Sequence, residues 1–429
     1  MLKSVVFALA FSFMFAATAF AQDSEVQDLK RRVEELEKRV EDGKVVSEEL
    51  AHKKLHPVHS IYGLTFSGSI TASAHGVKLS GDNEPSGEGA LSADLVVESP
   101  VGESGRAVIV LDFQRGAGMA LNFATAPNGN TTGYNADIES FNDTNVHLTQ
   151  AYYEHEADGR FSFSIGQLDI TGYFDGNEFA NNEKAQFMAT VFVNNPAIEF
   201  GGSENFYSFG ARATCAPTEN ISVTLGAFEG DGDYTDTFDK PFLMAEADFA
   251  FKPFGRDGNY RVYYWYRGAR PDEDTSTPTL DANNVATPGN TALLNAFNNG
   301  VGLSIDQMVT ETVGIWLRAG LQRETVAQFD KFVGAGVNVT GEFFGRANDQ
   351  MGIGYGASFM SQAYEDFNGS GFESAPEHYF ELYYNYAVEH AGVDEGFHIS
   401  PDFQFVVNPG GDKNADSAFI YGIRLQTYF

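Results

Sequence analysis

The stretch that decides the fold reads TVGIWLRAGLQR and spans residues 312–323. Apolar side chains occupy every second position, and most of the side chains between them are polar or aromatic. The apolar set is Val313, Ile315, Leu317, Ala319 and Leu321, and the other set includes Thr312, Trp316, Arg318 and Gln322. Successive side chains of a β-strand point to opposite faces of the sheet. One face of this strand therefore suits contact with lipid, and the other suits a water-filled interior. This is typical of a strand in a membrane barrel.

Residues 418–429 repeat this pattern at the C-terminus. One face consists of Phe419, Tyr421, Ile423, Leu425, Thr427 and Phe429, and the opposite face of Ala418, Gly422, Arg424, Gln426 and Tyr428. A soluble β-sandwich can alternate in the same way. The terminal Phe429 on the apolar face favours the barrel, because it is typical of the last strand of outer-membrane proteins.

About sixteen segments of this kind follow one another along the chain. They begin near Leu64, Glu88, Ser104, Asn145, Arg160, Phe206, Ile221, Phe242, Tyr260, Gly300, Thr312, Phe329, Asp349, His378, Gly396 and Ser417. Connections tend to be long after odd-numbered segments and short after even-numbered ones, as outer loops and periplasmic turns are. We therefore predict an all-β fold, a transmembrane antiparallel β-barrel of about 16 strands over residues 64–429, wide enough for an aqueous channel.

Residues 1–21 have the features of a secretory signal peptide. Lys3 precedes an apolar run, and the sequence AFA at 19–21 is a small-x-small cleavage site. After this leader, no apolar run approaches the roughly 18 residues of a membrane-spanning helix. We therefore predict export and a final location in the outer membrane of a Gram-negative cell.

The composition excludes several classes of function. Asp and Glu number 59 against 27 Lys and Arg, and a net charge of −32 argues against binding to nucleic acid. Cys215 is the single cysteine, so a disulfide framework and a cysteine-ligated metal cluster are excluded. The acidic run 231–233 lacks the terminal glutamate of an EF-hand, and no nucleophile elbow or zinc-binding histidine pair occurs. We predict no metal, no cofactor and no enzymatic activity.

Residues 22–55 are predicted to form a periplasmic coiled-coil helix. Apolar residues recur at alternating spacings of three and four, and this seam is Val26, Leu29, Val33, Leu36 and Val40. Arg32 and Glu37 flank the seam, where they can bridge neighbouring helices. The pattern favours a parallel three-stranded coil and a homotrimer. The alternative is a solitary charged helix. In either case, residues 56–63 would link the helix to the barrel.

Two long motifs resemble a known family. One is IGQLD at 165–169 with YFDGNEFANNE at 173–183 and VNNP at 193–196, and the other is SPDFQFVVNPGG at 400–411. Together with YRVY at 260–263, they resemble the carbohydrate-selective outer-membrane porins of the OprB type over most of residues 62–429. The resemblance implies that the first motif belongs to a loop in the middle of the barrel and that the second closes it. The N-terminal coiled-coil segment is an addition to the simplest members.

The loop from residue 170 to residue 205 is the first candidate site. It is too rich in asparagine and acidic residues to face lipid, and we expect it to fold into the pore as a constriction. Its candidate solute-binding residues are Asp175, Asn177, Asn181, Asn182, Glu183 and Gln186, which offer donors and acceptors to hydroxyl groups. Phe174, Phe179 and Phe187 are expected to anchor the loop to the wall. The alternative is a solvated outer loop.

The inner wall supplies the second set of candidates. Alternation places Arg212, Arg261, Arg318 and Arg424 inward, where they would face the acidic loop across the lumen and order polar solutes. Neutralisation of acidic neighbours is the alternative. Trp265 and Trp316 also fall inward and could stack on a sugar ring, or else anchor at an interface. Asp402 and Gln404 are expected to line the channel.

The main functional hypothesis is an outer-membrane porin. We predict passive diffusion of small polar solutes, carbohydrates in particular, through a water-filled barrel narrowed by its third loop. Two alternatives remain. The chain could tether the outer membrane to the envelope through a periplasmic or peptidoglycan contact of its helix, or it could admit another ligand, such as an iron chelate.

Overall fold

The computed structural model describes the barrel region of the chain. The described residues are 59–61, 63–81, 86–116, 145–157, 159–200, 207–230, 234, 239–268, 297–325, 327–368, 372–388 and 396–429. The chain divides into the units Met1–His56 and Pro57–Phe429. The predicted signal peptide, coiled-coil seam and acidic run 231–233 lie outside the described residues.

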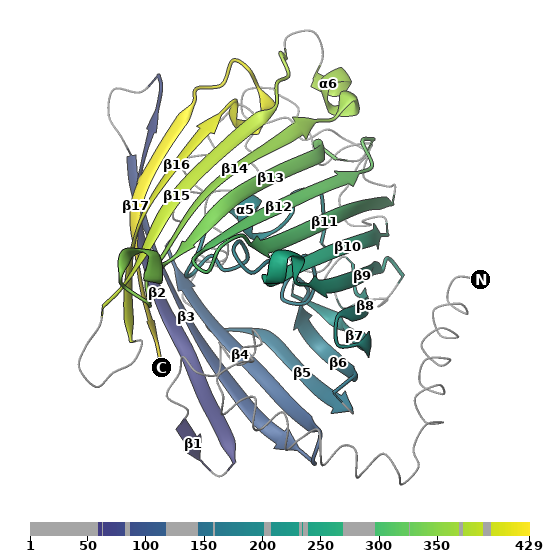
Figure 1. Ribbon diagram of the computed structural model, residues 1–429. Helices are drawn as coiled ribbons and strands as arrows, with labels where there is room; N and C mark the ends of the chain where they lie inside the picture. Colours follow the sequence, from purple (N-terminus) through teal and green to yellow (C-terminus); the bar gives the residue numbers. More distant parts are fainter. Residues whose placement is uncertain are drawn as a thin grey trace. The chain divides into compact units, whose positions relative to one another are not determined.

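Sixteen strands, β2 to β17, form a closed antiparallel barrel (Figure 1). The first eight are β2 (Leu64–Leu79), β3 (Ser86–Val101), β4 (Gly105–Arg115), β5 (His147–Ala157), β6 (Phe161–Asp169), β7 (Tyr207–Thr218), β8 (Ile221–Phe228) and β9 (Phe242–Phe251). The others are β10 (Gly258–Arg267), β11 (Asn298–Met308), β12 (Val313–Gln322), β13 (Phe329–Thr340), β14 (Gln350–Met360), β15 (Glu377–Ala387), β16 (Phe397–Val407) and β17 (Ala418–Tyr428). Each strand begins within about two residues of its predicted start, so the predicted barrel is confirmed.

Short elements accompany the barrel. They are β1 (His59–Ile61), which pairs with β2, the α-helices α5 (Thr190–Val193) and α6 (Gln362–Asn368), and the 3₁₀ turns η1 (Pro253–Gly255), η2 (Gly341–Phe344) and η4 (Pro409–Gly411). No helix in the described part of the chain is long and apolar enough to span a membrane.

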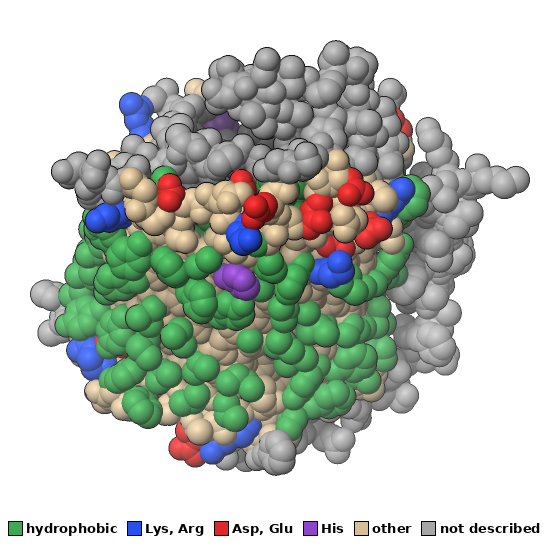
Figure 2. All heavy atoms as spheres, turned by 90° about the horizontal axis from the view of Figure 1, so that it is seen from above, with side chains coloured by type: hydrophobic (Ala, Val, Ile, Leu, Met, Phe, Trp, Pro, Cys, Tyr) green, Lys and Arg blue, Asp and Glu red, His purple; other side chains and the backbone are tan. Residues whose placement is uncertain are grey.

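The two faces of each strand differ as the alternation predicts. On β12, the outward Ile315 and Leu321 are exposed, whereas the inward Trp316 and Arg318 are buried. Hydrophobic side chains cover a broad field of the outer surface, and charged side chains gather along its margins (Figure 2). A band of this kind on the outside of a closed barrel matches the lipid-facing surface of a transmembrane barrel.

The barrel closes where β17 pairs with β2. The backbone N–H of Gly68 donates to the carbonyl of Phe429 at 2.9 Å, and the N–H of Phe429 donates back at 3.0 Å. A Cβ atom on Gly68 would lie 2.2 Å from the backbone oxygen of Asp94 and 2.6 Å from the Phe429 ring, so only glycine fits at this point of the seam. Closure removes the open edges that would otherwise pair with another chain.

The ends of the barrel differ in their connections. Chain direction places the short connections, such as that from β3 to β4 and that from β7 to β8, at the end where β2 begins and β17 finishes. We call this the turn end and the opposite one the loop end. The long connections, including the one between β6 and β7, start from the loop end.

Candidate solute pathway

The third long connection comprises residues 170–206 and is here called L3, and its described residues lie inside the barrel. Its described part extends to Phe200 and contains α5, which lies within the ring of strands (Figure 1). L3 bonds to inward-facing side chains of β3, β9, β10, β11, β12, β15 and β17. The connection thus crosses the interior and contacts the far wall.

Asp175 is the most extensively bonded of the predicted L3 residues. Its carboxylate accepts hydrogen bonds from the hydroxyl of Tyr263 at 2.9 Å and from the backbone N–H of Asn195 at 2.7 Å, and it pairs with Arg318 Nε at 3.1 Å. Its own N–H donates to Glu246 at 2.8 Å, and its backbone has a left-handed φ of 60°. Burial raises the pKa of the Asp175 carboxyl, and Arg318 and the two hydrogen bonds oppose that rise.

Asn177 holds the next part of L3 against β11. Its side-chain amide donates to the hydroxyl of Ser304 at 3.0 Å. The neighbouring N–H of Glu178 donates to Asp306 at 3.2 Å, and Asp306 also accepts from Arg261 at 2.5 Å. The predicted Arg261 therefore contacts the wall beneath L3 instead of facing the loop across an open lumen.

Three predicted polar residues shape L3 itself. The carbonyl oxygen of the Gln186 side chain accepts the backbone N–H groups of Asn181 and Asn182 at 3.0 and 3.2 Å. The Asn182 side chain accepts the N–H groups of Lys184 and Ala185, each at 3.0 Å. These side chains satisfy backbone donors of the loop, as such residues do in turns.

The tip of L3 contacts β15, β17 and β3. Glu381 accepts the N–H groups of Met188 and Ala189, the latter at 3.0 Å. Arg424, whose side chain is fully buried, donates to two backbone carbonyls of L3, one of them that of Gln186 at 3.0 Å. L3 is thereby attached to the walls on both sides of α5.

Glu183 and Lys184 lie at this tip. The backbone carbonyl of Glu183 accepts from Arg424, and burial raises the pKa of the Glu183 carboxyl. Lys184 forms an ion pair with Asp94 of β3. The predicted Glu183 thus contacts the wall through its backbone.

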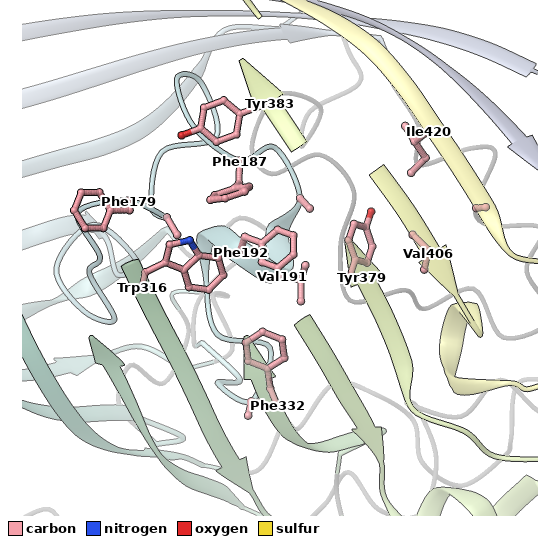
Figure 3. Packing of buried hydrophobic residues seen from close by; sticks show 14 of the residues in the cluster. Phe179, Phe187, Val191, Phe192, Trp316, Phe332, Tyr379, Tyr383, Val406 and Ile420 are labelled. Atoms are coloured by element: carbon pink, nitrogen blue, oxygen red, sulfur yellow. The ribbon is translucent and has the colours of Figure 1, made fainter. Parts of the chain in front are cut away.

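Both tryptophans face inward and are covered by L3. Trp265 is 0% exposed and its indole N–H donates to the backbone carbonyl of Ala197 at 3.2 Å, and Trp316 is 2% exposed. The Trp316 ring packs edge-on against Phe187 and Phe192, at 5.6 and 5.5 Å between centroids (Figure 3). Stacking of either indole on a sugar would require L3 to move.

Asp402 and Gln404 lie on the inner face of β16. The side-chain amide of Gln404 donates to Asp402 at 2.8 Å, and Gln404 accepts from the hydroxyl of Tyr379 at 2.8 Å. Both side chains are buried. Like Arg318 and Arg424, they point inward without being open to solvent.

The wall of β3 to β7 carries charged side chains, some of which are partly exposed to solvent. Arg106 pairs with Glu98 at 3.1 Å, and each side chain is 31% exposed. Arg106 also pairs with Glu154, which pairs with the predicted Arg212, and Arg212 lies 4.2 Å above the ring of Tyr173. The ion pairs run from the turn end to Arg212, whose contact with Tyr173 continues the chain to L3.

Sequence reasoning missed Glu98, Arg106 and Glu154. Alternation on β3, β4 and β5 places all three inward. Charged residues at inward positions of a strand were the signal that could have found them.

A family comparison assigns the barrel. Residues 68–429 match the family described as "Carbohydrate-selective porin, OprB family". The chain belongs to this family. OprB-family proteins are outer-membrane channels, which pass small solutes by diffusion and are not enzymes, so this chain is placed in the Gram-negative outer membrane.

Individual relatives are more distant. An uncharacterized protein of Aquifex aeolicus is 30% identical over 131 residues, which is 30% of this chain and 37% of that protein. Porin B of Pseudomonas aeruginosa is 24% identical over 324 residues, which is 67% of this chain and 68% of that protein. The match therefore spans little more than a third of the Aquifex protein.

Solved structures share the fold. The high-pH structure of Pseudomonas putida OprB has a TM-score of 0.67 at 17% identity, and covers 86% of this chain and 94% of its own. The outer membrane channel DcaP of Acinetobacter baumannii has a TM-score of 0.52 at 14% identity, and covers 87% of this chain and 100% of its own. Both OprB-family and DcaP structures support the closed barrel.

Proposed function

We propose that the barrel passes small polar solutes, carbohydrates in particular, between L3 and the wall of β3 to β7. The observation that carries the proposal is the uneven attachment of L3, which bonds to β9, β10, β11, β12, β15 and β17 but contacts the β3 to β7 wall mainly through Lys184–Asp94 and Tyr173–Arg212. Its ion pair with β12 has no exposed side-chain surface, whereas the Arg106–Glu98 pair on the opposite wall is 31% exposed on both sides. The narrow section would therefore lie between L3 and Arg106.

The chemistry of this wall suits hydroxyl groups. Arg106 and Arg212 offer donors that buried Glu154 holds in place, and Glu98 offers an acceptor beside them. The hydroxyl groups of a sugar can bond in turn to the donors and the acceptors of this wall, and a neutral sugar brings no charge that the wall would have to balance. A solute with a strong net charge would lack such balanced partners, so neutral carbohydrates fit better.

Liposome swelling with a pentose, a hexose and a disaccharide tests the function. We expect a rate that falls with sugar size and is lost after heat-unfolding of the protein. An absence of swelling by folded protein would contradict a diffusion channel, and faster entry of an iron chelate than of any sugar would contradict carbohydrate preference.

Substitution tests the position of the pathway. We expect Arg106→Trp to slow entry of the disaccharide, because the indole would fill the proposed narrow section. Arg160→Trp, on the exposed turn between β5 and β6, provides the control. Equal swelling by both variants would place the pathway elsewhere.

The N-terminal segment and the orientation of the barrel belong to the proposal as well. We propose that residues 1–21 direct export, that residues 22–55 form a coiled coil, and that the turn end faces the periplasm. The Val26 to Val40 seam then brings three barrels together as a homotrimer.

A further inference from the structure

Four phenylalanines of L3 share one kind of neighbour, because each ring lies against an inward glycine of the wall. The pairs are Phe174 with Gly226 of β8, Phe179 with Gly314 of β12, Phe187 with Gly354 of β14, and Phe192 with Gly356 of β14. Glycine is unfavourable inside a strand because it packs nothing and gains backbone freedom on unfolding. Its presence at these positions therefore calls for a reason.

The closest pair is Phe179 with Gly314. A Cβ atom on Gly314 would lie 2.3 Å from the Phe179 ring, and its three nearest atoms all belong to that ring. A Cβ atom on Gly226 would lie 2.8 Å from Phe174 and 2.5 Å from Phe228. Non-bonded carbon atoms prefer about 3.5–4.0 Å, so a hydrogen is the only side chain that fits at either position.

The pairs on β14 are tight as well. A Cβ atom on Gly354 would lie 3.0 Å from the Phe187 ring. One on Gly356 would lie 3.0 Å from Phe332 of β13 and 3.3 Å from Phe192. Phe187 and Phe192 are fully buried and pack on each other and on Trp316 (Figure 3). Because neighbours enclose these rings, a displaced ring would take the backbone of L3 with it.

We infer that the wall glycines are positioning residues that set how far L3 projects into the barrel. Each missing Cβ lets a phenylalanine sit closer to the wall, and the loop follows its rings. A methyl group on the inner face of β12 or β14 would push L3 toward β3 to β7 and narrow the pathway. The inference rests on the proposed function, because it assumes that solutes pass on that side of L3.

Single-channel conductance of Gly314→Ala in planar bilayers tests the inference. We expect a loss of conductance relative to the wild type. Phe179→Ala removes the ring that the methyl group would push, so Gly314→Ala should have no further effect in that background. Gly87→Ala is the control, since its added Cβ meets only a backbone oxygen at 3.5 Å.

The outcomes distinguish the positioning role of the glycines from the proposed function as a diffusion channel. Unchanged or increased conductance in Gly314→Ala, or an equal loss with and without the Phe179 ring, would overturn the positioning role. A wild type that forms no pore would instead overturn the proposed function. If Gly314→Ala does not assemble, Gly354→Ala with and without Phe187→Ala gives the same comparison, because its contact is milder.

Discussion

Arg318 and Asp175 form an ion pair in which neither side chain is exposed, with 3.1 Å between Nε and the carboxylate, although 143 residues separate them. Arg318 also donates to the backbone carbonyls of Asp175, at 2.8 Å, and of Phe192. One guanidinium therefore fixes L3 at two points. Loss of one partner of a buried pair typically costs about 3–5 kcal/mol, because the other charge stays buried alone.

We therefore expect Arg318→Met to release L3 while the barrel still folds. Single-channel records should show larger or fluctuating conductance, because the loop would sample positions away from β12. Asp175→Asn combined with Arg318→Met should cost less stability than Arg318→Met alone, since no unpaired charge remains. Arg323→Met, at the loop end, is the control, and records that match this control would contradict the anchoring role.

Tryptophan fluorescence distinguishes a buried indole from a solute-binding one. The chain contains two tryptophans, and both are covered by L3. We expect blue-shifted emission, weak quenching by iodide and no change on addition of sugars. Saturable quenching by a sugar would instead favour stacking on Trp265 or Trp316.

Charge selectivity should depend on the β3 to β7 wall more than on net charge. Arg106→Gln removes one positive charge from the proposed pathway, so the reversal potential in a salt gradient should shift toward cation preference. Lys413→Gln makes the same change in net charge at an exposed pair on the loop end, where we expect no shift. Equal shifts in both variants would place selectivity outside the barrel interior.

Acid stability should depend on Asp349, which lies between η2 and β14. Burial by itself raises the pKa of this carboxyl, but hydrogen bonds from Arg346, Tyr384 and the N–H of Ala387 outweigh it and lower the pKa. A lowered pKa gives stability that is complete above the unfolded value of about 3.9 and is lost as pH falls through the folded value.

Asp349→Asn tests this dependence. In detergent, the difference in unfolding temperature between wild type and variant should stay constant above about pH 5 and shrink below about pH 4. The far-ultraviolet circular dichroism signal, followed during heating, would measure this difference. A difference that persists unchanged at low pH would show that the carboxylate charge contributes nothing.

The predicted coiled coil can be tested apart from the barrel. Val33→Asp with Leu36→Asp places charges in the seam, which should convert a trimer to monomers in mild detergent without unfolding the barrel. Lys38→Asp, at a position outside the seam, is the control. A native protein that is already monomeric by light scattering would contradict the homotrimer.

Sequence alone determined the strands and the direction of their side chains. The apolar positions of residues 312–323 and the inward positions of Trp316 and Arg318 follow from alternation along the strand. Alternation is a local property, and a shift of the strand by two residues leaves each side chain on the same face. Fold class, strand number and family could therefore be predicted from residues close together in the chain.

Only the tertiary structure decided which inward side chains remain open. Arg106 and Arg318 both point inward, yet one is 31% exposed and the other is fully buried, because L3 lies against β12 and away from β4. That choice depends on contacts between distant residues, such as the fit of the Phe179 ring against Gly314. Alternation identifies the face of a strand, but it carries no information on what packs against that face.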